Sequence, residues 1–268
     1  MQKKAYTMEA LRTPVEAWGK IAVGIKAYDY MDGTSNNYGV RSVKLYVDSV
    51  EVFRSMVDGF LPNENRMINA WTDYEEYVSR NSWFMRSQIL PGNTWRMLQA
   101  DENGGVVTID EERFYHFRYE LQDLYGNKRT YSFKVKGKQT PITPVDKTDK
   151  HYFHWNRGNV LLEPGMLLVV YRGMLYDDVK LNAKVLTDSL GISYTYQLND
   201  KPVPLHAGCP LSIGIRQYPV DDMSKYYVAK LHKGRKSSAG GTFKDGYINT
   251  TIRELGTYTV ALDTVAPK

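Results

Sequence analysis

The chain has 268 residues, with 35 Lys and Arg, 30 Asp and Glu, and a formal net charge of +5. Hydrophobic residues at 42% and charged residues at 24% are typical of a globular protein and exclude a disordered or fibrous chain. Basic and acidic residues are interleaved, which indicates a solvated surface and argues against nucleic-acid binding. The 21 tyrosines favour β structure, because a tyrosine ring packs on a pleated surface while its hydroxyl stays hydrated.

The first half of the chain alternates apolar and polar residues, as half-buried β-strands do. Alternation predicts a strand over residues 20–27 and a hairpin over 40–53 that turns at Asp48-Ser49. A second hairpin is predicted over 115–135, with its turn at 123–127, where a Gly-Asn pair suits a tight return. These elements favour an antiparallel, immunoglobulin-like β-sandwich for the first domain.

An insertion of different character interrupts this first domain at about 62–110. Residues 65–78 have spacing compatible with a short helix, in which Ile68, Trp71 and Val78 share a face. The insertion is rich in aromatic residues, and two interpretations stay open: an interaction surface, or packing back on the sandwich itself. The residues of this candidate surface are Trp71, Tyr74, Tyr77, Trp83, Phe84 and Trp95.

A polar segment at 139–150 with two prolines and no periodicity is the expected linker. It divides the chain into domains 1–140 and 141–268. Alternation resumes beyond it, so the second domain is also predicted to be an antiparallel β-sandwich. The expected inward residues are Leu167, Val169, Val179, Leu181, Ala183, Val185, Leu211, Ile213, Ile215, Tyr258, Val260 and Leu262.

The histidines offer little catalytic chemistry. His151 and His154 form the only close pair, but a helix that would bring both to one metal is improbable after the linker, and no third ligand is suggested. His116 is expected on the outward face of a strand, and His206 in a turn near Pro204.

Other reactive groups also fit structural roles. Asp29, Asp32 and Asn36 flank a glycine and are a calcium candidate, against the alternative of a plain loop. Asp177-Asp178 is a weaker candidate, because adjacent carboxylates on an extended chain point apart. Cys209 is expected to be a small buried hydrophobe. No nucleophile elbow, phosphate loop or dinucleotide fingerprint occurs, and no metal or other cofactor is predicted.

No apolar run approaches the roughly 20 residues that a membrane-spanning helix needs, and 166–171 is the longest candidate. The basic residues near Met1 are followed by no apolar stretch, so no signal peptide is expected.

Six stretches of the sequence are informative in their wording: Pro14–Asn36, Tyr74-Glu75-Glu76, Pro91-Gly92-Asn93, Ile109–Arg113, Asp123–Asn127 and Arg253–Val260. They resemble the region downstream of the catalytic domain in Bacteroides-type lysostaphin-like (LytM-like) zinc metallopeptidases. The similarity covers nearly the whole chain, and its longest run, residues 14–36, is specific.

The resemblance implies an attached role rather than catalysis. The catalytic domain of that family binds zinc through a His-x-x-x-Asp motif and a His-x-His motif, and this sequence has neither; the nearest departure is His116-Phe117-Arg118-Tyr119-Glu120. The implied location is the periplasm or cell envelope, and the implied partner is a peptidoglycan endopeptidase domain upstream in the same polypeptide. A chain without a signal peptide fits a fragment of a longer secreted protein.

The leading hypothesis is therefore a non-catalytic accessory module that positions or shields the peptidase through the aromatic insertion. The alternative is a glycan- or peptidoglycan-binding module, since aromatic rings stack on sugar faces. A third hypothesis is that the protein is a hydrolase that uses His151 and His154.

Overall fold

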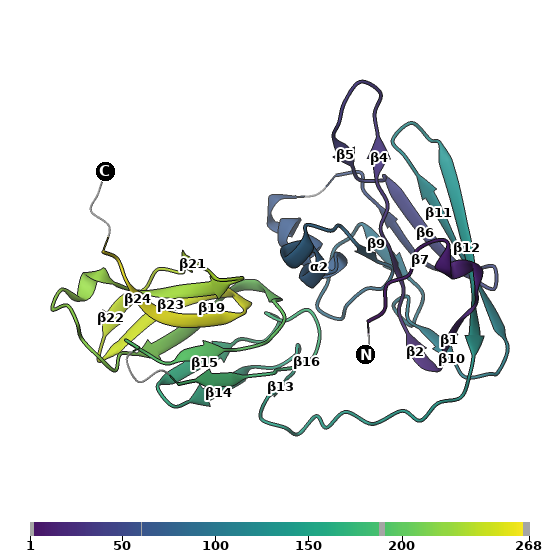
Figure 1. The fold of residues 1–268 in the computed structure, drawn as a ribbon. Helices are drawn as coiled ribbons and strands as arrows, with labels where there is room; N and C mark the ends of the chain where they lie inside the picture. The colour runs from purple at the N-terminus through teal and green to yellow at the C-terminus, as the bar shows by residue number, and fades with distance from the viewer. Residues whose placement is uncertain (1–2, 60, 188–190, 265–268) are drawn as a thin grey trace. The chain divides into compact units, whose positions relative to one another are not determined.

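The computed structural model describes residues 3–59, 61–187 and 191–264. Strands make up 44% of the described residues and helices 9%, so the predicted β class is confirmed. The chain divides into two compact units, Met1–Val145 (unit 1) and Asp146–Lys268 (unit 2), close to the predicted boundary at 140 (Figure 1). None of the helices in the described ranges has the length and apolar composition needed to cross a membrane.

Unit 1 combines one large sheet with short strand pairs and helical turns. Its described elements are η1 (Ala10–Arg12), β1 (Val15–Ala17), β2 (Gly19–Ile21), β3 (Gly24–Ile25), β4 (Asp29–Tyr30), β5 (Asn37–Tyr38), β6 (Ser42–Val47), β7 (Val50–Met56), η2 (Pro62–Met67), α1 (Ile68–Trp71), α2 (Tyr74–Arg80), β8 (Met85–Arg86), β9 (Leu98–Ala100), β10 (Val107–Ile109), β11 (Phe114–Gln122) and β12 (Lys128–Gly137).

The large sheet has the order β1-β12-β11-β6-β7-β9 (Figure 1). Both predicted hairpins are confirmed within it. β6 and β7 pair across a turn in which Asp48 and Ser49 adopt positive φ values of 47° and 72°, as tight hairpin turns require. β11 pairs with β12 over its whole length, and Gly126 has a φ of 92° in their turn. One pair departs from the antiparallel prediction: β1 runs parallel to β12, because a long connection rather than a hairpin joins them.

The predicted strand over 20–27 is wrong as one element, although Ile21 and Ile25 pack against the core as expected. It splits into β2 and β3, since β2 pairs with β10 while β3 pairs with β8. The segment 62–110 is also more than an insertion. Its strands β8, β9 and β10 pair with β3, β7 and β2, so it is part of the unit's own framework.

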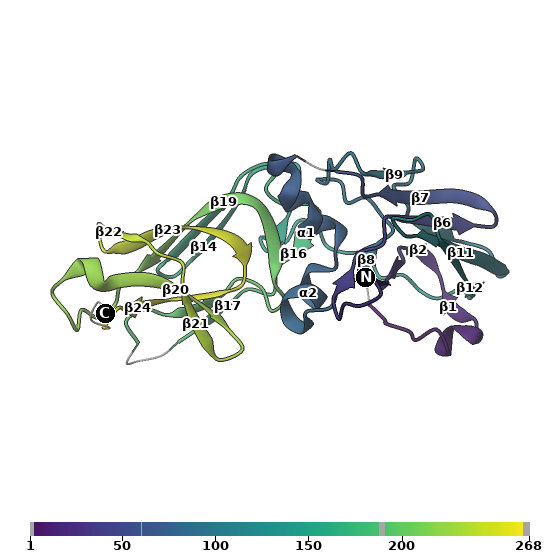
Figure 2. The same cartoon turned by 90° about the horizontal axis from the view of Figure 1, so that it is seen from above.

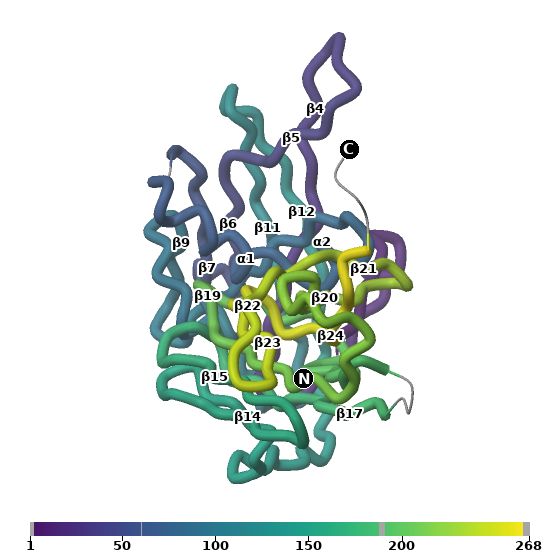
Figure 3. The backbone as a smooth tube through the Cα atoms, turned by 90° about the vertical axis from the view of Figure 1, so that its left-hand side faces the viewer, coloured from purple at the N-terminus to yellow at the C-terminus, as the bar shows by residue number. Residues whose placement is uncertain are grey.

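The predicted helix over 65–78 is two short helices, α1 and α2, which lie together near β8 (Figure 2). They are separated because Asp73 leaves helical geometry to cap α2, its side chain accepting the N–H of Glu76 at 3.3 Å. The hairpin β4–β5 projects away from the rest of unit 1 in Figures 1 and 3, and it carries the Asp29–Asn36 loop at its tip.

Unit 2 is built almost wholly from strands. Its described elements are β13 (Tyr152–Phe153), β14 (Asn159–Glu163), β15 (Met166–Val170), β16 (Val179–Lys180), β17 (Lys184–Leu186), β18 (Thr195–Gln197), β19 (Val203–Gly214), η3 (Met223–Lys225), β20 (Tyr226–His232), β21 (Arg235–Ser238), β22 (Thr242–Lys244), β23 (Tyr247–Leu255) and β24 (Thr257–Leu262).

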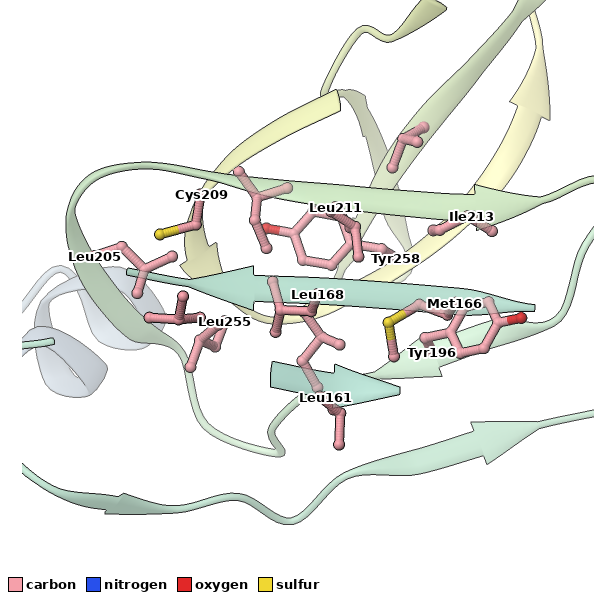
Figure 4. Packing of buried hydrophobic residues seen from close by; sticks show 14 of the residues in the cluster. Leu161, Met166, Leu168, Tyr196, Leu205, Cys209, Leu211, Ile213, Leu255 and Tyr258 are labelled. Carbon is pink, nitrogen blue, oxygen red and sulfur yellow. The ribbon is translucent and has the colours of Figure 1, made fainter. Parts of the chain in front are cut away.

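One sheet of unit 2 has the order β14-β15-β19-β23-β22 and another has the order β17-β18-β24-β20-β21. Side chains from both sheets fill a single core, because Leu168 and Leu211 of the first meet Tyr196 and Tyr258 of the second (Figure 4). Cys209 lies in this core with 0% exposure, and burial raises the pKa of its thiol, so the prediction of a buried hydrophobe is confirmed.

Three details of unit 2 differ from the prediction. In β15 it is Met166, Leu168 and Val170 that face the core, while Leu167 and Val169 face outward. Residues 179–185 are not one strand, because β16 pairs with β13 and β17 with β18. His206 lies within β19 rather than in a turn, and the nearby Pro and Gly residues produce a bulge in the strand instead.

Buried tyrosines tie loops to strands in both units. The Tyr115 hydroxyl accepts the backbone N–H of Glu111 at 3.1 Å, a few residues upstream. The hydroxyls of Tyr226 and Tyr258 instead donate, to the carbonyls of Val220 and Glu254 respectively, each at 2.7 Å. Each ring therefore adds to a core, while the hydroxyl fixes the preceding loop at Tyr115 and Tyr226 and the end of β23 at Tyr258.

Candidate functional site

The aromatic residues of segment 62–110 form a chain of edge-to-face contacts that leads from the core to the surface. Trp71 lies 5.5 Å from Trp95 and 6.0 Å from Trp83 between ring centroids, and Trp83 lies 5.8 Å from Tyr77. Trp71 and Trp95 are each 4% exposed, whereas Tyr77 is 44% exposed. Tyr77, at the outer end of this row of aromatic contacts, is thus accessible, while Trp71 and Trp95 at the inner end belong to the core.

The geometry of α2 fixes this accessible end. The backbone N–H of Asp73 donates to the Phe84 carbonyl at 2.8 Å, which ties the start of α2 to the segment before β8. At its other end α2 stops at Asn81, whose left-handed φ of 52° turns the chain back. Tyr77 and Trp83 therefore stand on opposite sides of one tight turn and meet across it.

The predicted surface residues separate into two groups. Tyr74, Tyr77, Trp83 and Phe84 retain partial or full exposure, and we call them the α2 aromatic surface. Trp71 and Trp95 are packing residues beneath it. The Phe84 ring lies over Gly24, where a Cβ atom would collide with it, so even the exposed members rest on fixed backbone.

Charged residues border the α2 aromatic surface. Lys3 reaches Asp73 at 2.6 Å and Glu75 at 3.0 Å, and Arg80 pairs with Glu76 at 2.9 Å along the helix. An aromatic centre with a polar rim is the composition found in protein–protein contacts.

The two close histidines of unit 2 do not converge on a common point. His151 lies 3.4 Å from Asp149 and 3.5 Å from Glu163, whereas His154 lies 3.6 Å from Asp178. Throughout residues 3–59, 61–187 and 191–264, no three His, Cys, Asp or Glu side chains gather in a group that could hold a metal.

Asp178 organises the start of unit 2, a role that the sequence did not indicate. Burial raises its pKa, but the N–H of Trp155, the Tyr152 hydroxyl and the nearby His154 and Lys147 outweigh this effect, so the pKa lies below its usual value. The Trp155 N–H donates at 3.2 Å and the Tyr152 hydroxyl at 3.1 Å. The carboxylate thereby anchors the segment that follows the linker.

The outer face of the sheet β14-β15-β19-β23-β22 carries a shallow hollow of about 420 Å³. Leu162 and Leu167 form its apolar side, and Ser212, Tyr247 and Asn249 form its polar side. Tyr247 is 40% exposed, and the Ser212 hydroxyl donates to the Asn249 side-chain oxygen at 2.6 Å. To predict this hollow from the sequence, one would need to know which residues of β15 face outward. Every residue of that strand is apolar, so the sequence does not show which ones do.

Comparison with known proteins gives a match to a family model. The model of a family described as "Zu5-like domain" matches residues 150–263, which lie within unit 2 and extend from just before β13 to just after β24. Unit 2 is thus similar to Zu5-like domains. No curated protein and no solved structure matches the chain. The match concerns no peptidase, so the resemblance of the sequence to lysostaphin-like peptidases stays a prediction.

Proposed function

We propose that the chain is a non-catalytic accessory module that binds a protein partner through the α2 aromatic surface. The proposal rests on the row of aromatic ring contacts, in which exposed Tyr77 and part-exposed Trp83 rest on the buried Trp71 and Trp95. Rings held in this way lose little conformational freedom on binding, and aromatic anchors supply much of the energy of protein interfaces.

The proposed partner is a zinc peptidase domain of the lysostaphin-like kind, encoded upstream in the same polypeptide and acting on peptidoglycan in the periplasm or cell envelope. The support is the resemblance of the sequence, above all in residues 14–36. In this role the module positions or shields the peptidase and performs no chemistry itself.

For the fold we propose two tandem immunoglobulin-like sandwiches. In unit 1 the support is the order β12-β11-β6-β7, which is the order of strands G, F, C and C′ in such domains. Tyr115 adds to it, because a tyrosine near the start of strand F bonds to upstream backbone in this fold. In unit 2 the support is the pair of sheets that share one core.

The test is binding of the chain to the separately produced peptidase domain, measured by calorimetry. Tyr77→Ala and Trp83→Ala are expected to weaken binding at least about tenfold, as loss of an aromatic anchor does. Tyr125→Ala is the matched control, since Tyr125 is 73% exposed at the β11–β12 turn. Equal affinities for all three variants, or no binding by the unaltered chain, would contradict the proposal.

Glycan binding is the second candidate, and the hollow on unit 2 favours it. An exposed tyrosine beside amide and hydroxyl groups can stack on a sugar face while its neighbours bond to sugar hydroxyls. A pull-down on purified peptidoglycan separates the two candidates. Loss of retention in Tyr247→Ala, with Tyr77→Ala and Trp83→Ala unchanged, supports glycan binding at unit 2, whereas no retention of the unaltered chain excludes it.

A further inference from the structure

A second hollow, of about 380 Å³, lies on the outer face of the large sheet of unit 1. Its floor is formed by β11 and β12, and its walls by η1 and the β6–β7 turn. This face is opposite to the core, because Phe117 and Phe133 point inward and their rings stack 5.0 Å apart.

Strand register brings cations together in this hollow. His116 pairs directly with Lys134, and Arg118 with Ser132, so all four side chains face outward between neighbouring strands. Arg12 of η1 adds another cation at the wall. Among the described residues, the lining contains no Asp or Glu.

Two carboxylates border the hollow without lining it. Asp48 accepts the backbone N–H of His116 at 2.9 Å and the Arg113 guanidinium at 2.7 Å. Burial raises the pKa of Asp48, but these two donors outweigh burial and the pKa lies below its usual value. Glu120 is shared between Lys128 at 3.6 Å and Arg118 at 3.9 Å, so it offsets part of the Arg118 charge. No carboxylate of the described lining offsets the charges of Arg12 and Lys134.

Aromatic rings hold two of the donors, since the Lys134 ammonium lies 5.9 Å from the centre of the Phe114 ring. The Arg118 guanidinium stacks on the Tyr46 ring at 4.0 Å, which holds the side chain in place. Ser49 and Ser132 add hydroxyl groups at the rim of the same hollow. A fixed guanidinium, an ammonium group and hydroxyls together match the several oxygens of a phosphate better than the two oxygens of a carboxylate.

We propose that this hollow binds a phosphate group carried by a larger polar molecule such as a phosphorylated sugar. The volume exceeds that of a phosphate ion alone, which leaves room for the attached moiety. An anion would also relieve the repulsion between Arg118 and Lys134, which are diagonal neighbours on β11 and β12. This inference goes beyond the proposed function, because it concerns a different face of unit 1 from the α2 aromatic surface.

The experiment is a titration of the ¹⁵N-labelled full chain, followed by NMR at constant ionic strength. The probes are inorganic phosphate, a hexose 6-phosphate, the unphosphorylated hexose and acetate. We expect saturable shifts of the amides at 116–118 and 132–134 with both phosphates, tighter binding of the hexose phosphate, and no saturation with hexose or acetate. Stronger binding of free phosphate than of hexose phosphate would overturn the assignment of a larger ligand, and equal binding of acetate would overturn the phosphate class.

Substitutions localise the site. Arg118→Gln and Lys134→Gln are expected to weaken phosphate binding at least about tenfold each, since each removes a charged donor. Lys136→Gln is the matched control, because Lys136 lies on the same strand outside the hollow. An equal loss in all three variants would indicate unspecific attraction to a basic face and contradict the proposal. Tyr77→Ala should leave phosphate binding unchanged, so failure here is distinct from failure of the proposed partner contact.

Discussion

The two units differ in how completely strands cover their cores. In unit 2, sheets lie on both sides of the core, and tyrosines such as Tyr196, Tyr226 and Tyr258 are buried with their hydroxyls bonded to backbone carbonyls. In unit 1, the large sheet faces short strand pairs and two helices, and here Tyr77 reaches the surface. Where helices replace strands, a row of aromatic contacts can lead from the core to the surface, whereas in unit 2 exposed tyrosines such as Tyr247 lie outside the core cluster.

The largest expected effect comes from the inner end of the aromatic chain. Trp71→Ala should destabilise unit 1 by about 3–5 kcal/mol, because it removes a large buried ring that touches both Trp83 and Trp95. Hydrogen exchange with mass spectrometry, in denaturant, reports each unit separately. Loss of protection confined to unit 1 is the expected result, and a loss below 1 kcal/mol would mean that Trp71 is not a core residue.

Alkaline pH should act on the closed core of unit 2. Burial raises the pKa of Tyr196 to about 12, and the ordinary value is 10.0. Since the native state favours the neutral phenol, its stability is complete below pH 10 and falls as the pH rises toward 12, by roughly 2–3 kcal/mol in total. Denaturant midpoints between pH 9 and pH 12 measure this, and Tyr196→Phe should flatten the slope. The same slope in the variant would assign the effect to another group.

Removal of one hydroxyl should have a smaller effect. Tyr226→Phe leaves the Val220 carbonyl without its 2.7 Å donor and should cost about 1–2 kcal/mol. The change should increase exchange of the loop before β20 more than exchange of β24. Uniform loosening of unit 2 would show that the hydroxyl does not specifically fix this loop.

The smallest effect is expected at the exposed end of the aromatic chain. Tyr77→Ala should change the unfolding free energy by no more than about 0.5 kcal/mol beyond the helix propensity of alanine, because the ring is half in solvent. Thermal unfolding measures it. A cost near that of Trp71→Ala would make Tyr77 a packing residue and erase the contrast between the two ends.

The sequence alone correctly predicted the strands that have one apolar and one polar face. Residues 43–53 and 115–135 alternate clearly and are joined by turn residues, so their hairpins and inward faces could be derived. In β15 the sequence Met-Leu-Leu-Val-Val is apolar on both faces, so only pairing with β14 and β19 decides that Leu168 is buried and Leu167 is not.

The sequence predicts which residue types make up the candidate site, but not how deeply each side chain is buried. Aromatic density pointed to segment 62–110, yet the same residue type lies in the core at Trp71 and part-exposed at Trp83. The difference depends on the Asp73 cap and on pairing of β8 with β3, which are tertiary and local backbone effects without a periodic signal. The cationic hollow likewise depends on the register between β11 and β12, which places His116 opposite Lys134.

The central claim is that the exposed end of the aromatic chain is a contact surface. Hydrogen exchange of the chain, alone and bound to the proposed peptidase partner, tests it most directly. We expect new protection at residues 74–84, with the β11–β12 turn and the cores of both units unchanged. Binding that leaves 74–84 as exchangeable as in the free chain would contradict the claim.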